Sequence, residues 1–478
     1  MIRIRHWRCN PLSQVISRTN LLNERTIMSE DINKDNLRAR LKKEIIQNNI
    51  YGVDIEEGAI EIARLRFWLS LVIDLDKPEA LPNFDYKFMQ GNSLLESTML
   101  SGTNKPFNLN IQEMLQGKFR FPHLKTALKN LYDELNRFYS ETDHIKKQAS
   151  RKAIKGYVID VLNDCVDYEP SKMQEISAIA AKTKDDFTCT DFFLWHTWFA
   201  DVFGLDIDED SSEGSKNGGF DIVIGNPPYI GLGGELNKIY SAYKYVEPKQ
   251  NAKKKSTVTA VNAVYKFKTY DGNGDIYCLF YEWGRELLKA NGHLCYITSN
   301  KWMRAGYGEE LRGLLAKETN PLLLIDFGGV KVFENATVDV NILLFEKTDK
   351  NMGQTWCAAG ESDAEVLAAY KKERGLSPDT KDVRITEKVH YFLTDYMYRD
   401  STVMQFDSSK TWVISSSSVF EQIKTKIEKV GVALKDWDIR INYGIKTGCN
   451  DAFIIDTAKR EEILANTAVC AGASVGGL

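Results

Sequence analysis

The sequence lacks the features of a membrane or secreted protein. It has no apolar run near the roughly 18 residues that a membrane-spanning helix needs, and its amino terminus has no apolar segment typical of a secretion signal. Its 8 cysteines are scattered and never form a Cys-x-x-Cys pair, which favours reduced, buried thiols. We therefore expect a cytoplasmic protein without membrane contact.

A strong excess of one charge is also lacking. The net charge is −4 over 478 residues, and 43% of the residues are hydrophobic and 27% charged. The overall charge does not indicate nucleic-acid binding, so any basic surface that contacts DNA has to be local. The length predicts two or three domains with a sizeable core.

Calcium loops are absent as well. Two acidic stretches, 206–210 and 271–275, lack the glycine that a calcium loop needs at its sixth position, because Ser211 and Ile276 stand there. We therefore expect no metal site.

The most informative stretch is Phe220 to Tyr229, which reads Phe-Asp-Ile-Val-Ile-Gly-Asn-Pro-Pro-Tyr. Its β-branched run predicts a buried strand at the centre of a parallel sheet. Gly225, Pro227 and Pro228 predict a rigid loop at the carboxyl end of that strand. Ligands bind at this edge in open α/β sheets.

The polar groups of this loop suit an amino group on a nucleobase. Such a group is a poor nucleophile because its lone pair is delocalised into the ring. The side-chain oxygen of Asn226 and the carbonyl of Pro227 can accept its two hydrogens, and Tyr229 offers an aromatic face for an extruded base. The alternative is that Asn-Pro-Pro-Tyr is only a turn.

These residues resemble the catalytic loop of amino-group DNA methyltransferases. The surrounding sequence, over residues 50–350 and 411–460, resembles the adenine-specific methylase domain of type IIG restriction-modification enzymes and their phage-defence relatives. The resemblance implies a Rossmann-like α/β sheet that binds S-adenosylmethionine. It also implies that Asn226, Pro227, Pro228 and Tyr229 act on a flipped adenine of double-stranded DNA.

Two upstream segments predict the cofactor site. A strand at Ile50–Asp54 ends in an acidic residue and precedes an apolar helix at Ala59–Ile73. The carboxylate of Asp54 suits the ribose hydroxyls of the cofactor, although a helix cap is the alternative. Asn92 follows the next strand in a Gly-Asn-Ser sequence, and the resemblance implies that it meets the adenine of the cofactor. A plain turn is again the alternative.

One part of the methyltransferase pattern is missing. Such folds normally begin with a strand and a glycine loop that lets the backbone approach the cofactor. No such loop precedes Tyr51, and none follows Tyr229. We therefore expect a chain cut at both ends, with residues 1–49 as an N-terminal remnant and a separate polypeptide as the source of the cofactor loop.

A helical insertion at 100–200 is expected within a core domain at 50–350. Leucines at positions 124, 128, 131 and 135 repeat at helical spacing within Leu124–Leu162, which predicts an antiparallel helix pair. Five aromatic residues between 192 and 199 are expected to dock this insertion on the core.

Beyond the catalytic loop, helices alternate with strands in a doubly wound pattern. The strands are expected at Gly292–Thr298, Leu322–Phe327 and Asn341–Glu346, and the last of them is expected to close the sheet.

Two segments are candidates for DNA contact. Asn300–Gly308 resembles the family's target pocket and contributes Lys301, Trp302 and Arg304. The other segment is a basic loop with tyrosines, which holds Lys253 and Lys254 and reads equally well as a DNA clamp or as a solvated loop.

The carboxyl-terminal part predicts a linker and an incomplete domain. Residues 351–410 are polar and irregular, which is typical of a linker. From Thr411, and above all at Arg440–Phe453, the chain resembles the opening of the family's target-recognition domain, which 411–478 leaves incomplete.

Together these patterns predict an adenine-N6 DNA methyltransferase of a restriction-modification or phage-defence system. One alternative is a catalytically inert DNA-binding fragment, which would not bind S-adenosylmethionine. Another is a glutamine methyltransferase acting on release factors, which carries the same Asn-Pro-Pro-Tyr. Those enzymes are compact, so the helical insertion and the segment Tyr443–Phe453 argue against that reading.

Overall fold

The structure is a computed structural model of the chain. It describes residues 34–73, 81–99, 106–111, 122–164, 170–184, 186–204, 218–246, 264–334, 338–360, 362–399, 401–414, 418–432 and 436–437. The chain divides into two compact units, Met1–Ser416 and Ser417–Leu478. The described part of the second unit includes helix α15 (Ser418–Val430), whereas the segment Arg440–Phe453 and the lysines at 253 and 254 lie outside the described residues.

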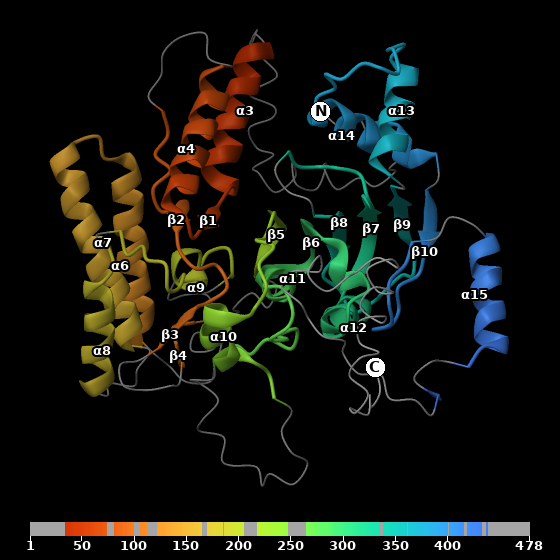
Figure 1. The fold of residues 1–478 in the computed structure, drawn as a ribbon. Helices are drawn as coiled ribbons and strands as arrows, with labels where there is room; N and C mark the ends of the chain where they lie inside the picture. Colours follow the sequence, from red (N-terminus) through yellow and green to blue (C-terminus); the bar gives the residue numbers. More distant parts are fainter. Residues whose placement is uncertain are drawn as a thin grey trace, which may run out of the picture. The chain divides into compact units, whose positions relative to one another are not determined.

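The first unit contains two sheets that carry the predicted site (Figure 1). The larger has six strands in the order β10-β9-β7-β8-β6-β5, and a smaller one pairs β1 with β2. Their bounds are β1 Gly52–Asp54, β2 Phe88–Gln90, β5 Phe220–Gly225, β6 Leu288–Ser299, β7 Asn320–Asp326, β8 Val340–Glu346, β9 Thr355–Ala359 and β10 Thr402–Met404. A third, two-stranded sheet pairs β3 (Ser97–Met99) with β4 (Pro106–Asn108).

Strand directions follow from the connections between strands. β1 pairs in parallel with β2 and β5 with β6, and each pair is joined by a crossover that contains a helix, as parallel strands require. The crossover helices are α4 (Glu57–Val72) and α11 (Tyr277–Leu287), and α12 (Glu309–Glu318) connects β6 to β7. Helix α3 (Lys34–Asn49) leads into β1. The α/β architecture predicted from the sequence is confirmed.

Three predictions about strands need correction. β8 does not close the sheet but runs antiparallel between β6 and β7, and it is buried or half-buried along its length because it has a neighbour on each side. β5 is not the buried central strand of a parallel sheet. Within the described residues it pairs only with β6, and Ile222 and Ile224 are 65% and 79% exposed.

The linker predicted at 351–410 is the third correction. This segment adds β9 in parallel with β7 and β10 beyond it, and it forms helices α13 (Asp363–Glu373) and α14 (Ile385–Thr394). Its short apolar runs supply buried side chains such as Val366 and Phe392 to the core. Trp412, which was assigned to the recognition domain, packs on Trp302 at 5.3 Å between ring centroids and belongs to the first unit.

The segment predicted as a helical insertion contains three long helices, one more than the expected pair. Helices α6 (Pro122–Ser140) and α7 (His144–Asp164) are joined by three residues and so run antiparallel, and α8 (Pro170–Ala181) follows them. The four leucines of the predicted stripe on α6 are all buried. The remaining short helices are α9 Trp195–Trp198, α10 Gly234–Tyr240, η1 Ser241–Tyr243, η2 Asn300–Met303, η3 Gly306–Gly308 and η4 Tyr396–Tyr398.

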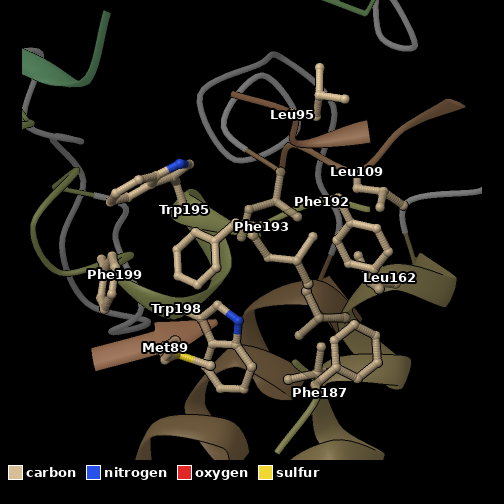
Figure 2. Close-up of a cluster of buried hydrophobic side chains, with 14 of the residues drawn as sticks. Met89, Leu95, Leu109, Leu162, Phe187, Phe192, Phe193, Trp195, Trp198 and Phe199 are labelled. Carbon is tan, nitrogen blue, oxygen red and sulfur yellow. The ribbon is translucent and has the colours of Figure 1, made fainter. Parts of the chain in front are cut away.

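Aromatic side chains dock the insertion on the core, as expected. Figure 2 shows them packed with Met89 of β2 and Leu162 of α7. All five are buried: Phe192, Phe193, Trp195, Trp198 and Phe199. The indole of Trp195 also donates a hydrogen bond to the carbonyl of Ser93 at 3.0 Å. The insertion is therefore part of the same core as β2.

Two further findings concern the chain as a whole. Among the described helices, none has the length and apolar character to cross a membrane. The described cysteines 189, 278, 295 and 357 are free thiols.

Candidate functional site

The Asn-Pro-Pro-Tyr loop starts where β5 ends. Gly225 lies so close to Tyr296 of β6 that a Cβ atom there would be 3.1 Å from the tyrosine ring. Asn226 is exposed, Pro227 is buried and Tyr229 is half-buried. The loop is thus anchored by its first proline, and it presents the Asn226 amide at the surface.

Tyr229 holds this amide in place. Its hydroxyl is 2.8 Å from Oδ1 of Asn226, to which it donates a hydrogen bond, and 3.3 Å from the carbonyl oxygen of Ile297 on β6. The ring of Tyr229 packs edge-on against Tyr277 at 6.3 Å. Burial raises the pKa of Tyr229 to about 12, so at neutral pH the hydroxyl is protonated and remains a donor.

A hydrogen-bonded chain of three polar side chains begins at Tyr277, which packs against the ring of Tyr229. The hydroxyls of Tyr277 and Tyr307 are 2.8 Å apart, and Tyr307 donates to Oδ2 of Asp275 at 2.9 Å. Burial raises the pKa of the Tyr277 hydroxyl far above its usual range. These three residues were not predicted as part of the site. The only sequence signal is that Tyr307 falls within Asn300–Gly308, the segment that resembles the target pocket.

The two predicted cofactor residues lie at the carboxyl ends of neighbouring strands. Asp54 is the last residue of β1, and it aligns with Gln90 of β2, two residues before Asn92. The exposed carboxylate of Asp54 accepts the backbone N–H of Glu56 at 2.8 Å through Oδ1. The carboxylate has a second oxygen, Oδ2, which can accept a ribose hydroxyl. Asp54 therefore fits both readings, because it orders the turn before α4 and still presents an acceptor.

Asn92 connects the cofactor segment with the chain beyond the catalytic loop. Its Oδ1 accepts the backbone N–H of Leu94 at 3.1 Å, which is a turn contact. Its Nδ2 donates to the hydroxyl of Tyr240 on α10 at 3.1 Å. The plain-turn alternative accounts for the first contact and not for the second.

A contact at the opposite ends of the strands brings β1 and β5 together. Tyr51 directly precedes β1, and its ring lies 5.7 Å from that of Phe220, the first residue of β5. Phe199 packs on both rings, at 4.7 Å and 6.1 Å. The amino ends of β1 and β5 thus share one aromatic cluster, while the Asn92–Tyr240 hydrogen bond joins the segment after β2 to α10, which follows β5.

The structure separates the residues predicted to contact DNA. Lys301 is exposed, and the Arg304 guanidinium is half-exposed and lies 3.2 Å from a carboxylate oxygen of Asp326. Trp302 is fully buried, and its indole N–H donates to Oδ1 of Asn341 at 3.1 Å. Its packing against Trp412 gives it a role in the core, and because it is fully buried it cannot contact DNA.

Asp326 is a fourth residue that the sequence did not reveal. It is buried at the end of β7 and accepts the Asn300 amide at 2.8 Å and the backbone N–H of Gly328 at 2.9 Å. Together with Arg304 it fixes the turn after β6 beside the catalytic loop. An aspartate that ends an apolar strand was the only available signal.

A cavity of about 620 Å³ lies away from the catalytic loop. Its lining includes the buried pair Glu96 and His196, which are 2.6 Å apart, and also Tyr243, Arg285 and Lys347. None of the predicted site residues lines it. The candidate site therefore lies outside this cavity.

Comparison with known proteins identifies the family to which the chain is similar. The sequence profile described as Eco57I restriction-modification methylase matches residues 48–333. The putative type II restriction enzyme and methyltransferase RM.MjaORFECS2P of Methanocaldococcus jannaschii is 29% identical over 232 residues, covering 39% of this chain and 18% of that protein. The type II methyltransferase M.BstVI of Geobacillus stearothermophilus is 23% identical over 270 residues, covering 56% of this chain and 40% of that protein.

Similarity among solved structures is weaker. The M protein of the type I restriction enzyme EcoKI is 14% identical, covering 84% of this chain and 97% of that one, with a TM-score of 0.21. The chain spans less than half the length of the two curated relatives named above. Because the profile covers more than half of the chain and includes β1, β2, β5 and the catalytic loop, the chain belongs to the Eco57I restriction-modification methylase family.

Proposed function

We propose that this chain is the adenine-N6 methyltransferase core of a restriction-modification system and acts on double-stranded DNA. The observation that carries the proposal is the pairing of Asn226 with Tyr229, in which an exposed amide oxygen lies 2.8 Å from a phenol at the carboxyl edge of the sheet. Family membership supports methylation in a restriction-modification system. Adenine is the finer assignment, and it depends on the loop.

The proposed chemistry is one of position and hydrogen bonding. The Asn226 oxygen and the Pro227 carbonyl accept the two hydrogens of the target amino group, which frees its lone pair for reaction. The Tyr229 ring supplies a face on which the flipped base stacks. In the proposed complex the amino group replaces the Tyr229 hydroxyl as donor to Asn226, and the carbonyl of Ile297 then accepts from that hydroxyl.

S-adenosylmethionine is the proposed cofactor and would supply an electrophilic methyl group. Asp54 would hold its ribose and Asn92 its adenine, because both lie at the carboxyl ends of β1 and β2. We also propose that a separate polypeptide supplies the glycine loop that the sequence lacks. Lys301 and Arg304 are the proposed phosphate contacts among the described residues, together with Lys253 and Lys254.

The test is methyl transfer from labelled S-adenosylmethionine to three substrates: duplex DNA containing adenine, the same DNA with adenine replaced by purine, and a glutamine peptide. We expect label in the first alone. Asn226→Ala is expected to abolish transfer. The matched change is Asn351→Ala, at an amide that donates to the backbone carbonyls of Ala316 and Phe406 and accepts from the backbone N–H of Gly353, and it is expected to leave transfer intact. Transfer to the glutamine peptide instead would reject the DNA assignment.

A further inference from the structure

The cavity of about 620 Å³ lies at the amino ends of β5 and β6. Gly218, which precedes β5, and Leu288, the first residue of β6, both line it. The catalytic loop begins after Gly225, at the other end of β5. Small-molecule sites typically have volumes of roughly 300–1,000 Å³. The fold therefore provides a space large enough for a ligand that is separate from the proposed active site.

Two glycines hold the walls of this cavity together. Gly218 lies so close to Phe203 that a Cβ atom would be 1.8 Å from the carbonyl oxygen of Phe203. Gly219 has a φ of +133°, and a Cβ atom there would be 2.4 Å from the backbone nitrogen of Lys289. Only glycine permits both approaches. The aromatic segment after α9 and the turn between α11 and β6 are thus held against the same two residues, and both segments line the cavity.

The apolar part of the lining is largely aromatic. Tyr265 packs edge-on against Phe267 and against Trp283, with 5.1 Å between the ring centroids in each pair. Phe203 and Tyr243 line the cavity as well. A small-molecule site typically combines such a lining with a few polar groups that orient the ligand. Aromatic side chains of this kind favour a flat ring, which can stack on them or meet their edges.

His196 provides the first of these polar groups. Its Nδ1 is 2.6 Å from Oε2 of Glu96, and Oε1 of Glu96 accepts the backbone N–H of His196 at 2.8 Å. Because an ionised carboxylate only accepts, Nδ1 carries a hydrogen, and Nε2 of the neutral ring is then an acceptor. Nε2 has no hydrogen-bond partner within the described residues. The ring lies 4.1 Å from that of Phe203, so this acceptor is held in a fixed place.

Lys347 provides the second polar group, and it is cationic. Its ammonium donates to the carbonyl oxygens of Leu288 at 2.6 Å and Glu286 at 3.2 Å, which leaves a third N–H. In the part of the chain that the structure describes, Lys347 forms no ion pair, whereas Arg285 pairs with Glu286 and Glu318. Burial lowers the pKa of Lys347, because its charge is poorly compensated. An anionic group in the cavity would compensate it.

Tyr243 provides the third polar group. Its hydroxyl accepts a hydrogen bond from Oγ of Ser97 at 3.0 Å, and its own O–H has no acceptor among the described residues. Burial raises the pKa of Tyr243, so the hydroxyl stays protonated at neutral pH. The cavity therefore presents one acceptor, one neutral donor and one cation beside aromatic side chains.

We propose that this cavity binds a nucleoside monophosphate. The base lies among the aromatic side chains and donates an N–H to Nε2 of His196, the phosphate lies at Lys347, and an oxygen of the ligand accepts from Tyr243. A nucleotide combines the flat ring, the N–H donor and the anionic group that the lining favours. The site is additional to the proposed methyl transfer and does not depend on it.

The direct test is titration calorimetry of the full chain with adenosine monophosphate, adenosine and inorganic phosphate. We expect the monophosphate to bind with a submillimolar dissociation constant. Adenosine should bind at least tenfold more weakly, because it lacks the charge that meets Lys347, and inorganic phosphate should not bind at millimolar concentration. An excess of S-adenosylhomocysteine should leave the affinity for the monophosphate unchanged, because the proposed cofactor residues Asp54 and Asn92 do not line the cavity.

A lysine variant tests the phosphate contact. Lys347→Met keeps most of the apolar stem and removes the charge, so it should weaken the monophosphate at least tenfold and change the affinity for adenosine less than twofold. Lys347→Arg should restore binding of the monophosphate. Lys155→Met is the matched control, because Lys155 is also half-buried and donates to the carbonyl of Thr183 at 2.8 Å. It should bind the monophosphate as the unchanged chain does.

Two exposed positions of the lining keep the test decisive if Lys347→Met fails to fold. Asp349 and Ala290 both line the cavity and are exposed, so changes there should be tolerated. Asp349→Asn removes a negative charge and should tighten the monophosphate by about twofold, whereas Ala290→Glu adds one and should weaken it by about fivefold.

Four outcomes would overturn the proposal. They are no binding of the monophosphate at millimolar concentration, equal affinity for inorganic phosphate, displacement of the monophosphate by S-adenosylhomocysteine, and unchanged affinity in both Asp349→Asn and Ala290→Glu. The second outcome would make Lys347 a general anion site, and the third would assign the nucleotide to the cofactor site. Methyl transfer is measured separately, so its absence would count against the proposed function and leave the nucleotide site intact.

Discussion

The hydrogen bond between Tyr229 and Asn226 gives the sharpest test of the site. Tyr229→Phe removes the hydroxyl that lies 2.8 Å from Asn226 Oδ1 and keeps the ring. A hydrogen bond between neutral groups contributes about 0.5–1.5 kcal/mol net, and because Asn226 is exposed water can replace the lost donor. We therefore expect a loss near the lower limit, about 0.5 kcal/mol, in urea unfolding followed by circular dichroism.

A double-mutant cycle separates this contact from other effects. Asn226→Ala, alone and combined with Tyr229→Phe, should give a coupling energy of about 0.5 kcal/mol. Tyr398→Phe is the matched control because Tyr398 is exposed, and it should change stability by less than about 0.3 kcal/mol. A coupling energy of zero, or a loss above about 2 kcal/mol in Tyr229→Phe, would refute the reasoning that the hydroxyl orients an accessible amide.

The same variant predicts a gain in base binding. In the free protein the Tyr229 hydroxyl competes with a target amino group for Asn226, so its removal should tighten binding of adenosine by about twofold, the equivalent of about 0.5 kcal/mol. Purine riboside lacks the amino group and should show no change. Tyr229→Ala should weaken both ligands by 5-fold or more, since base–aromatic stacking contributes about 1–3 kcal/mol. The measurement is titration calorimetry of both variants with both nucleosides, compared with the unchanged chain. Equal tightening of adenosine and purine riboside would contradict competition between the Tyr229 hydroxyl and the amino group.

Three further predictions concern the rest of the chain. In a spectroscopic pH titration, the Tyr229 phenol should ionise near its pKa of about 12. Because this pKa is raised, the contribution of the phenol to stability is complete below the unfolded pKa of about 10 and is lost as the pH rises from there to about 12. An equal loss of stability over that range in the Tyr229→Phe chain would count against this assignment. Leu128→Ala on α6, at a fully buried position, should cost about 2–5 kcal/mol in urea unfolding, while Ile145→Ala on α7, at an exposed position, should cost less than about 0.5 kcal/mol. Lys301→Ala should lower the slope of log affinity for DNA against log salt by about 1 if it contacts a phosphate, whereas Lys350→Ala, also exposed, should leave the slope unchanged.

The sequence predicted those parts of the fold that depend on local pattern. The run Ile222–Ile224 followed by glycine and two prolines located both a strand and the loop after it, because chain direction and backbone restriction are local properties. The leucine stripe of α6 located a helix for the same reason. Asp54 and Asn92 fell at adjacent strand ends because both follow short apolar strands.

The predictions that the structure corrects depend on tertiary contacts, which a local pattern does not contain. The Ile-Val-Ile run could not reveal that β5 pairs with β6 alone among the described strands, since burial depends on segments elsewhere in the chain. The sequence predicts a linker at Thr355–Ala359 because five residues with polar flanks show little periodicity, yet pairing with β7 makes them a strand. The resemblance of Asn300–Gly308 to the family's target pocket predicts that Trp302 contacts DNA, whereas its distant partners Asn341 and Trp412 show that it belongs to the core.

The aromatic segment that docks the insertion also sets the order in which the protein can fold. The hydrogen bond from Trp195 to Ser93 spans 102 residues, and that from His196 to Glu96 spans 100. A nascent chain therefore has no complete packing for β2 until the ribosome has delivered Phe199, and contacts of such long sequence separation form slowly. Expression fragments that stop inside the insertion should expose Met89 and Phe107, aggregate, and be recovered in inclusion bodies.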